Sequence, residues 1–255
     1  MSGAHAHGLF WHGSSRVHAL PPQCKIAAAG IFVLAVVLTP PQQVWVFAVY
    51  LLLLAAVIDR SRVRASFIAR RMTFALPFLL FALTLPFVGG GPPLELLGVH
   101  LSLEGTWAAF SIVTKGSFGI ACSILLGATT SMADLLRGFA RLGLPRTLIA
   151  IAGFMIRYGD LMTGEMKRMR IARLSRGYEP SWWWESRALA SSVGTLFIRA
   201  FERGERVHFA MLGRGFSGTM PDLDGIGATS RDWLGSLVVP LLAASMCALS
   251  VAVDL

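Results

Sequence analysis

Charged residues are scarce in this sequence. Asp, Glu, Lys and Arg make up 15% of the 255 residues, whereas hydrophobic residues make up 55% and the mean hydropathy is +0.62. A soluble domain of ordinary composition carries about 25% charged residues, so this shortage argues against one. The charges that are present are mostly basic, 23 Lys and Arg against 14 Asp and Glu. The resulting net charge of +9 would indicate nucleic-acid binding only if it lay on a solvated surface.

Motifs for redox, metal and nucleotide chemistry are also missing. Cys24, Cys122 and Cys247 lie far apart in apolar stretches and form no C-x-x-C pair, which indicates neither a zinc site nor a disulfide framework. No G-x-x-x-x-G-K-[ST] loop occurs, so we expect that the chain does not hydrolyse ATP itself. Residues 1–23 show no compact apolar core followed by a cleavage site, and we expect no signal peptide.

Long apolar runs are the main feature that is present. They lie at residues 25–39, 42–58, 73–88, 106–129 and 232–253. A helix needs about 20 residues to cross a bilayer, and the last two runs qualify by themselves. Pro40 and Pro41 force a reversal between the first two runs, because proline cannot continue a helix. The sequence therefore predicts an all-α, polytopic membrane protein with about five transmembrane helices.

The basic residues fall between these runs in an alternating pattern. Residues 59–71 hold five Arg against one Asp, residues 89–105 hold no Lys or Arg, and residues 131–231 hold fifteen Lys and Arg against nine Asp and Glu. With Arg16 and Lys25 ahead of the first span, the positive-inside rule places the N-terminus in the cytoplasm and the C-terminus outside. Topology thus accounts for the net charge. We expect contact with the lipid bilayer and none with nucleic acid.

The topology divides the chain into four segments. We expect a cytoplasmic lead over 1–24, transmembrane helices 1–4 over 25–130, a cytoplasmic helical module over 131–231 and a last transmembrane helix over 232–255. Within the module, Ser131 reads as the N-cap of a short amphipathic helix that Gly143 and Pro145 end. Two long helices follow, the first to about Arg176 and the second to about Gly213.

Both long helices end in the same pattern, Ala-x-x-x-Arg-Gly-aromatic. The two copies are ARLSRGY, residues 172–178, and AMLGRGF, residues 210–216. Their matching positions are Ala172 and Ala210, Ser175 and Gly213, Arg176 and Arg214, and Gly177 and Gly215. A glycine after the last turn and an arginine within it are ordinary helix-ending residues. The other interpretation is a pair of exposed guanidinium groups, presented side by side to a partner's carboxylates.

Three further features have alternative interpretations. Lys115 lies within the fourth apolar run, where an ammonium group either faces backbone carbonyls inside the bundle or contacts a second membrane subunit. His5 and His7 could bind a divalent metal, but a flexible tail gives no fixed geometry, so we expect no metal site. The tryptophans at 182–184 are expected to anchor the chain at the bilayer surface.

Several of these stretches resemble one known family. The paired Arg-Gly endings, the leading SSRVHALPPQCKI and the run LLGATTSMADLLRGFARLGLP are similar to the T components of energy-coupling-factor transporters, in particular the cobalt-type CbiQ family. The resemblance covers most of the chain. Members of the family often have Ala-Arg-Gly at these two sites, where this chain has Ser-Arg-Gly and Gly-Arg-Gly. That departure does not threaten the assignment.

The resemblance implies a non-enzymatic subunit of a cobalt importer, without a cofactor of its own. Two CbiO-like ATPase subunits would receive Arg176 and Arg214 in surface grooves. Residues 131–231 would be the coupling-helix module that passes ATPase motion to a CbiM-like substrate-binding membrane subunit, with a small CbiN-like subunit nearby. The same role in a nickel or vitamin importer is the alternative.

Two proteins of other classes fit the sequence less well. An intramembrane enzyme needs catalytic His, Asp or Glu within its spans, and the five runs contain no His and no acidic pair. The membrane domain of a conventional ABC importer would have one short coupling helix, not two long ones that end in arginine. The transport-coupling hypothesis is therefore preferred.

Overall fold

The computed structural model describes residues 13, 15–73, 76–88, 93–96, 99–178, 186–218 and 227–254. Its helices are α1 (Arg16–Ala19), α2 (Pro22–Leu38), α3 (Val44–Ser61), α4 (Ala65–Met72), α5 (Leu76–Val88), α6 (Leu103–Thr129), α7 (Met132–Arg141), α8 (Arg146–Leu174), α9 (Ser186–Leu212) and α10 (Ser230–Asp254). One antiparallel hairpin joins β1 (Pro93–Leu96) to β2 (Val99–Ser102). The prediction of an all-α protein is confirmed, with this hairpin as a small addition.

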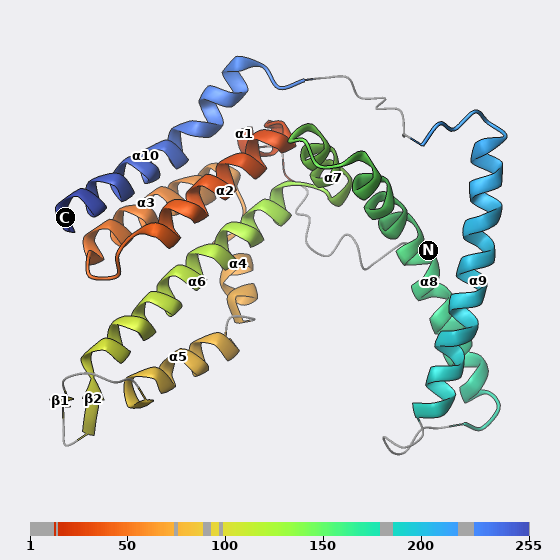
Figure 1. Cartoon of the computed structure of the whole chain (residues 1–255), viewed down its shortest axis with the longest axis horizontal. Coiled ribbons are helices and arrows are strands. Elements are labelled where there is room, and N and C mark those ends of the chain that lie inside the picture. Colours follow the sequence, from red (N-terminus) through yellow and green to blue (C-terminus); the bar gives the residue numbers. More distant parts are fainter. Residues whose placement is uncertain are drawn as a thin grey trace. The chain divides into compact units, whose positions relative to one another are not determined.

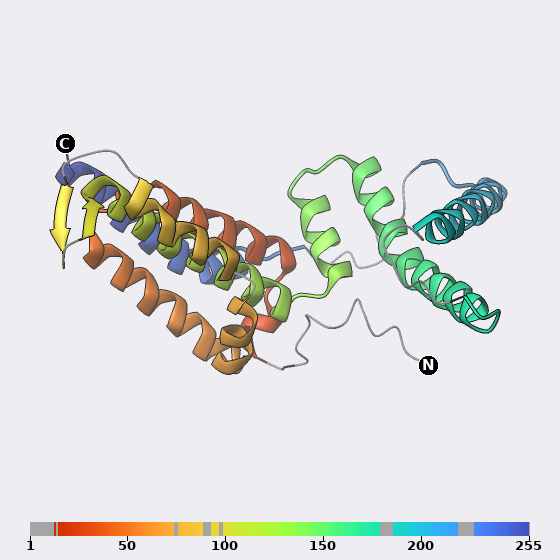
Figure 2. The ribbon, with the colours of Figure 1, turned by 90° about the horizontal axis from the view of Figure 1, so that it is seen from below.

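The chain forms two compact units. The bundle unit comprises Leu9–Leu142 and Ile226–Leu255, and the crossed-helix unit contains Gly143–Gly225 with α8 and α9. Within the bundle unit, α10 packs along α2, and α6 packs against α5 and α2 (Figure 1). Figure 2 shows the same helices from below, running roughly alongside one another. The predicted cytoplasmic module starts at residue 131, but α7 packs on α2 and so belongs to the bundle unit.

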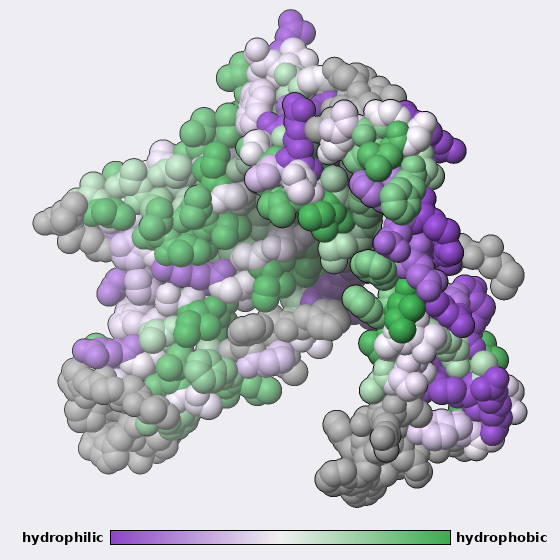
Figure 3. Space-filling model, turned by 45° about the vertical axis from the view of Figure 1, so that its right-hand side comes forward, coloured by the Kyte–Doolittle hydropathy of each residue, from purple (hydrophilic) through white to green (hydrophobic). Residues whose placement is uncertain are grey.

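Within the described ranges, three helices are long and apolar enough to cross a membrane: Val44–Ser61, Leu103–Thr129 and Ser230–Ala252. The shorter apolar helix Pro22–Leu38 spans about 26 Å at 1.5 Å per residue, close to the roughly 30 Å of a bilayer core. Large apolar side chains cover the outside of these helices, as the space-filling view shows in green (Figure 3). The chain is therefore a multi-pass membrane protein, and a total of five spans stays a prediction.

The core of the bundle unit is aromatic. The rings of Phe32, Phe47, Tyr50 and Phe118 lie with their centroids 5.9–6.5 Å apart, most of them edge to face. Edge-to-face packing brings the positive edge of one ring to the negative face of the next. The fully buried Tyr50 hydroxyl lies 2.8 Å from Thr39 Oγ1 and 3.3 Å from the Ala243 carbonyl oxygen. This cluster therefore joins α2, α3, α6 and α10.

Two local features were not predicted. The alternating apolar residues of LEL and VHL pair as β1 and β2, within the segment expected outside the cell. Residues 59–71 were expected to be a loop, yet Ala65–Met72 forms α4, where Ile68 is buried. Between α3 and α4 the chain turns at Arg62, which has φ 56°, a left-handed conformation that is uncommon outside glycine.

The predicted start and end of α7 are confirmed. Ser131 Oγ accepts a hydrogen bond from the Asp134 N–H at 3.2 Å, and Asp134 pairs with Arg137 at 2.7 Å. At the other end Gly143 has φ +95° and Pro145 is the N-cap of α8. The amphipathic face of α7 lies against the start of α2, where Gly138 is buried.

Gly138→Ala is expected to destabilise this packing. A Cβ at Gly138 would lie 2.6 Å from Ile26 Cδ1, 3.0 Å from the Pro22 carbonyl carbon and 3.1 Å from Gln23 N. The Ile26 methyl can move but the two backbone atoms cannot, and such overpacking costs about 1–3 kcal/mol. Thermal unfolding of the purified protein in detergent measures the loss. Gly30→Ala in α2 is the control, because nothing lies within 4 Å of its Cβ. If the Gly138 variant unfolds no earlier than the control, α7 does not pack on α2 in this way.

Candidate functional site

The first Arg-Gly pattern ends α8 in a defined backbone motif. The Tyr178 N–H donates to the Arg173 carbonyl at 3.2 Å, and the Gly177 N–H donates to the Leu174 carbonyl at 3.0 Å. Gly177 has φ +76°, a region that glycine enters without steric cost. These nested hydrogen bonds are the Schellman motif, in which glycine turns the chain away from the helix.

The second pattern ends α9 in the same way. The Phe216 N–H donates to the Met211 carbonyl at 3.0 Å, the Gly215 N–H donates to the Leu212 carbonyl at 2.9 Å, and Gly215 has φ +81°. The repeat in the sequence is therefore a repeat in the backbone. In both motifs the alanine, Ala172 or Ala210, is exposed in the last full turn.

The helix-ending interpretation accounts for the glycines but not for the arginines. Arg176 and Arg214 are both exposed, and neither forms an ion pair with any residue that the structure describes. The residues before them, Ser175 and Gly213, are exposed as well. Each guanidinium thus projects from a helix end with its five N–H donors available to a partner. Docking to a partner stays a prediction.

The arginines do not lie side by side, and that expectation is wrong. Figure 1 shows α8 and α9 running in opposite directions and crossing, so their C-terminal ends point away from one another. The 27 residues of α9 span about 40 Å, which separates Arg214 from the start of that helix. The spacing of the two Arg-Gly patterns along the sequence predicts the lengths of α8 and α9, but it does not predict how the two helices are oriented relative to one another. One pattern therefore lies at each end of the crossed-helix unit.

An ion-pair cluster connects α8 to α9. Arg199 Nη1 lies 2.8 Å from Glu165 Oε1, and Arg168 pairs with the other oxygen of the same carboxylate. Hydrogen bonds from Arg168 and then Arg199 lower the pKa of Glu165 below its ordinary value. A carboxyl group whose pKa is lower in the folded state than in the unfolded state stabilises the fold at any pH above its unfolded-state pKa. This contribution is lost as the pH falls through the folded-state pKa. The cluster is therefore fully formed at neutral pH.

Lys115 makes a hydrogen bond that joins α6 to α2 in the bundle unit. Its Nζ donates to the Val37 carbonyl at 2.7 Å, which satisfies one of the free carbonyls at the end of α2. This geometry agrees with the first alternative from the sequence, in which the Lys115 ammonium faces a backbone carbonyl. A contact with another subunit is left as a prediction.

Two of the predicted features lie outside the described residues. They are His5 and His7 in the N-terminal lead and the tryptophans at 182–184. Among the residues that the structure describes, no three His, Cys, Asp or Glu side chains lie together in a group that could hold a metal ion.

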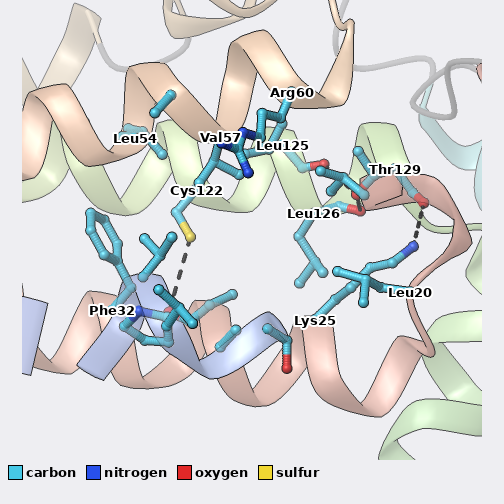
Figure 4. Close-up of a pocket in the computed structure, with 18 of the residues that line it drawn as sticks. Leu20, Lys25, Phe32, Leu54, Val57, Arg60, Cys122, Leu125, Leu126 and Thr129 are labelled. Carbon is cyan, nitrogen blue, oxygen red and sulfur yellow. Dashed lines mark hydrogen bonds between the residues drawn. The ribbon is translucent and has the colours of Figure 1, made fainter. Parts of the chain in front are cut away.

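Lys25 is the residue that sequence reasoning missed. It was counted as a charge ahead of the first span, yet it lies in α2 and is only 9% exposed. Its Nζ donates to the His18 carbonyl at 3.0 Å and to the Thr129 carbonyl at 2.9 Å; the second bond is dashed in Figure 4. Thr129 ends α6 two residues before the N-cap of α7. One buried cation thus joins the end of α1, the start of α2 and the segment that leads into α7.

Comparison with known proteins identifies the family. The model of the CbiQ family, described as cobalt transport protein, matches residues 13–223. The energy-coupling factor transporter transmembrane protein EcfT of Bacillus selenitireducens is 31% identical over 225 residues, 83% of each chain. The cobalt transport protein CbiQ of Rhodobacter capsulatus is 30% identical over 237 residues, 92% of this chain and 93% of the relative. EcfT of Staphylococcus aureus is 25% identical over 223 residues, 80% of each chain. The chain therefore belongs to the CbiQ family and is a transmembrane T component of an energy-coupling-factor transporter.

Proposed function

We propose that this chain couples two ATPase subunits to a substrate-binding membrane subunit in a cobalt importer. The observation that carries the proposal is the pair of identical Schellman endings, each with an exposed arginine, at opposite ends of the crossed-helix unit. A chain that docks one partner needs one such ending. Two endings about a helix length apart suit two copies of the same ATPase, each of which takes one guanidinium in an acidic groove.

The covalent connections give the route by which motion reaches the membrane. Only Leu142–Pro145 separate α7 from α8, so a displacement of α8 by an ATPase acts directly on α7. The packing of α7 on the start of α2 carries the displacement into the bundle unit. The chain in this account performs no chemistry: the ATPases, CbiO-like, hydrolyse ATP, and a CbiM-like subunit, with a CbiN-like subunit nearby, holds the ion.

The orientation follows from the same proposal. Residues 131–231 and the arginine-rich segment 59–71 lie in the cytoplasm with the ATPases, and the hairpin of β1 and β2 lies outside. Cobalt is proposed as cargo because a relative that aligns over nine-tenths of both chains is named a cobalt transport protein. A nickel or vitamin importer is the second candidate, since the EcfT relatives are named without a cargo.

Uptake of radioactive cobalt by cells tests this function. The chain is expressed with the ATPase and substrate-binding subunits encoded in the same genome, and the partners without the chain are the control. We expect ATP-dependent cobalt uptake only when the chain is present. Uptake that a tenfold excess of nickel suppresses completely would favour nickel as cargo. Equal uptake with and without the chain would contradict the coupling role.

A further inference from the structure

A partly open cavity lies between the helices of the bundle unit. It has a volume of about 970 Å³ and is bounded by α1, α2, α3, α6 and α10. That volume is at the upper end of the roughly 300–1,000 Å³ of ordinary small-molecule sites. Nothing in the coupling role uses this space.

The cavity has an apolar end and a basic end. Figure 4 shows Phe32 and Leu54 at one end and Lys25 and Thr129 at the other. The basic end lies where α2 begins and where α3 and α6 end, since Lys25, Arg60 and Thr129 occupy those helix ends. By the predicted topology this is the cytoplasmic side of the membrane. A ligand that fills the cavity must therefore be amphipathic.

The basic end carries more positive than negative charge. Lys25, Arg60 and Arg62 line it against one carboxylate, Asp59. The Lys25 ammonium is held by two carbonyls, but Arg60 and Arg62 are exposed and form no ion pair with any part of the chain that the structure describes. Arg62 is also the one non-glycine residue with positive φ within the described ranges. Strained residues of this kind gather at ligand sites.

The size and composition of the cavity distinguish between its candidate occupants. A partner helix about 10 Å across takes about 120 Å³ per residue, so the cavity would hold only about eight residues, less than half a span. A soluble anion would leave the apolar end empty. An acyl chain enters from the surrounding bilayer with little change of environment, because lipid tails are as apolar as leucine side chains. A phosphate headgroup then reaches Arg60 and Arg62, for which Arg is well suited.

We propose that this cavity binds an anionic phospholipid of the cytoplasmic leaflet, with the phosphate at Arg60 and Arg62 and one acyl chain along Val57, Leu125 and Val239. The proposal goes beyond the coupling function and does not depend on the identity of the cargo. Anionic lipid in this cavity would contact α3, α6 and α10 together.

Native mass spectrometry of the full chain, delipidated in detergent, tests the site. Phosphatidylglycerol and phosphatidylcholine with the same acyl chains are the probes. We expect Arg60→Ala and Arg62→Gly each to weaken phosphatidylglycerol binding about fivefold, the ratio that corresponds to about 1 kcal/mol per basic residue at a membrane surface. Glycine accepts the positive φ of position 62 without steric cost, so backbone strain at this position cannot account for a loss of binding in the Arg62→Gly variant.

Two controls separate the cavity from general attraction to basic residues. Arg70→Ala removes the same charge from the neighbouring α4, outside the cavity lining, and is expected to change binding less than twofold. Ala56→Phe narrows the cavity at an exposed lining position and is expected to weaken binding of both lipids. Equal losses in the Arg60 and Arg70 variants would overturn the proposal, as would equal affinity of the wild type for the two lipids. A photo-crosslinker at Val57 that captures another transporter subunit instead of lipid would also overturn it.

Discussion

Loss of both ATPase subunits from the purified complex is the expected result of replacing Arg176 and Arg214 together with Ala. Truncating one member of a buried, hydrogen-bonded charge pair at an interface costs about 2–5 kcal/mol, because the partner charge is left unpaired. Removing either arginine would then weaken the binding of its ATPase subunit by about 30-fold or more. If the arginines only complemented the helix dipole, each would contribute about 0.3–1 kcal/mol of local stability and docking would be unchanged.

The separation of the two arginines sharpens this prediction. Because the arginines lie at opposite ends of the crossed-helix unit, a single Arg→Ala change is expected to release one ATPase subunit and leave the other bound. The measured quantity is the ratio of ATPase to tagged chain after purification. Arg→Lys is expected to restore binding only in part, because an ammonium lacks the planar fork of the guanidinium.

Arg170→Ala is the matched control for these variants. Arg170 is exposed on the same helix and forms no ion pair within the described ranges. Arg173 serves this purpose less well, because its side chain is half-buried and its loss could also change local packing. If the double variant keeps both ATPases and transports at the wild-type rate, the arginines do not dock the ATPases and the repeat is only two similar helix ends.

Lys25→Met is expected to destabilise the bundle unit by about 2–6 kcal/mol. The change removes the one ammonium that donates to the part-buried His18 carbonyl and to the buried Thr129 carbonyl, and each buried acceptor left unsatisfied costs about 1–3 kcal/mol. Methionine has similar length and no polar atom that could replace the ammonium. Because Thr129 precedes α7, we also expect ATP hydrolysis in the assembled complex to drive less uptake per ATP.

Thermal unfolding in detergent and uptake per ATP hydrolysed measure the two parts of this prediction. Lys115→Met is the control, since Lys115 also donates to a carbonyl at a helix end but makes one bond in place of two, at an exposed site. We expect it to cost less than half as much. If the Lys25 variant is as stable as the wild type, the ammonium does not hold the two segments together.

The sequence predicts those features of this protein that depend on local chemistry. The apolar runs mark α2, α3, α6 and α10 to within a few residues, because Pro40 and Pro41 interrupt them and the polar flanks end them. The Arg-Gly repeat marks the ends of α8 and α9, because only glycine enters the required backbone region easily.

Features that depend on tertiary contacts were not predictable in this way. The role of Lys25 depends on the Thr129 carbonyl, 104 residues away along the chain. The contact of Arg199 in α9 with Glu165 in α8 joins residues 34 positions apart along the chain, and no local pattern marks such a pair. The β1–β2 hairpin was missed because each strand has four residues, too few for an alternating pattern to stand out from a loop.

Site-specific photo-crosslinking from the two helix ends tests the central claim most directly. A photoreactive amino acid is placed at Ser175 or at Gly213, next to the arginines and without removing them. Both positions accept a side chain, because Ser175 is exposed and a Cβ at Gly213 would make only ordinary contacts at 3.6 Å and 3.8 Å. In the assembled transporter each position is predicted to crosslink to an ATPase subunit, whereas the exposed Glu202 in the middle of α9, away from both helix ends, serves as the control. Crosslinks from both positions to lipid or to the substrate-binding subunit alone would contradict the account.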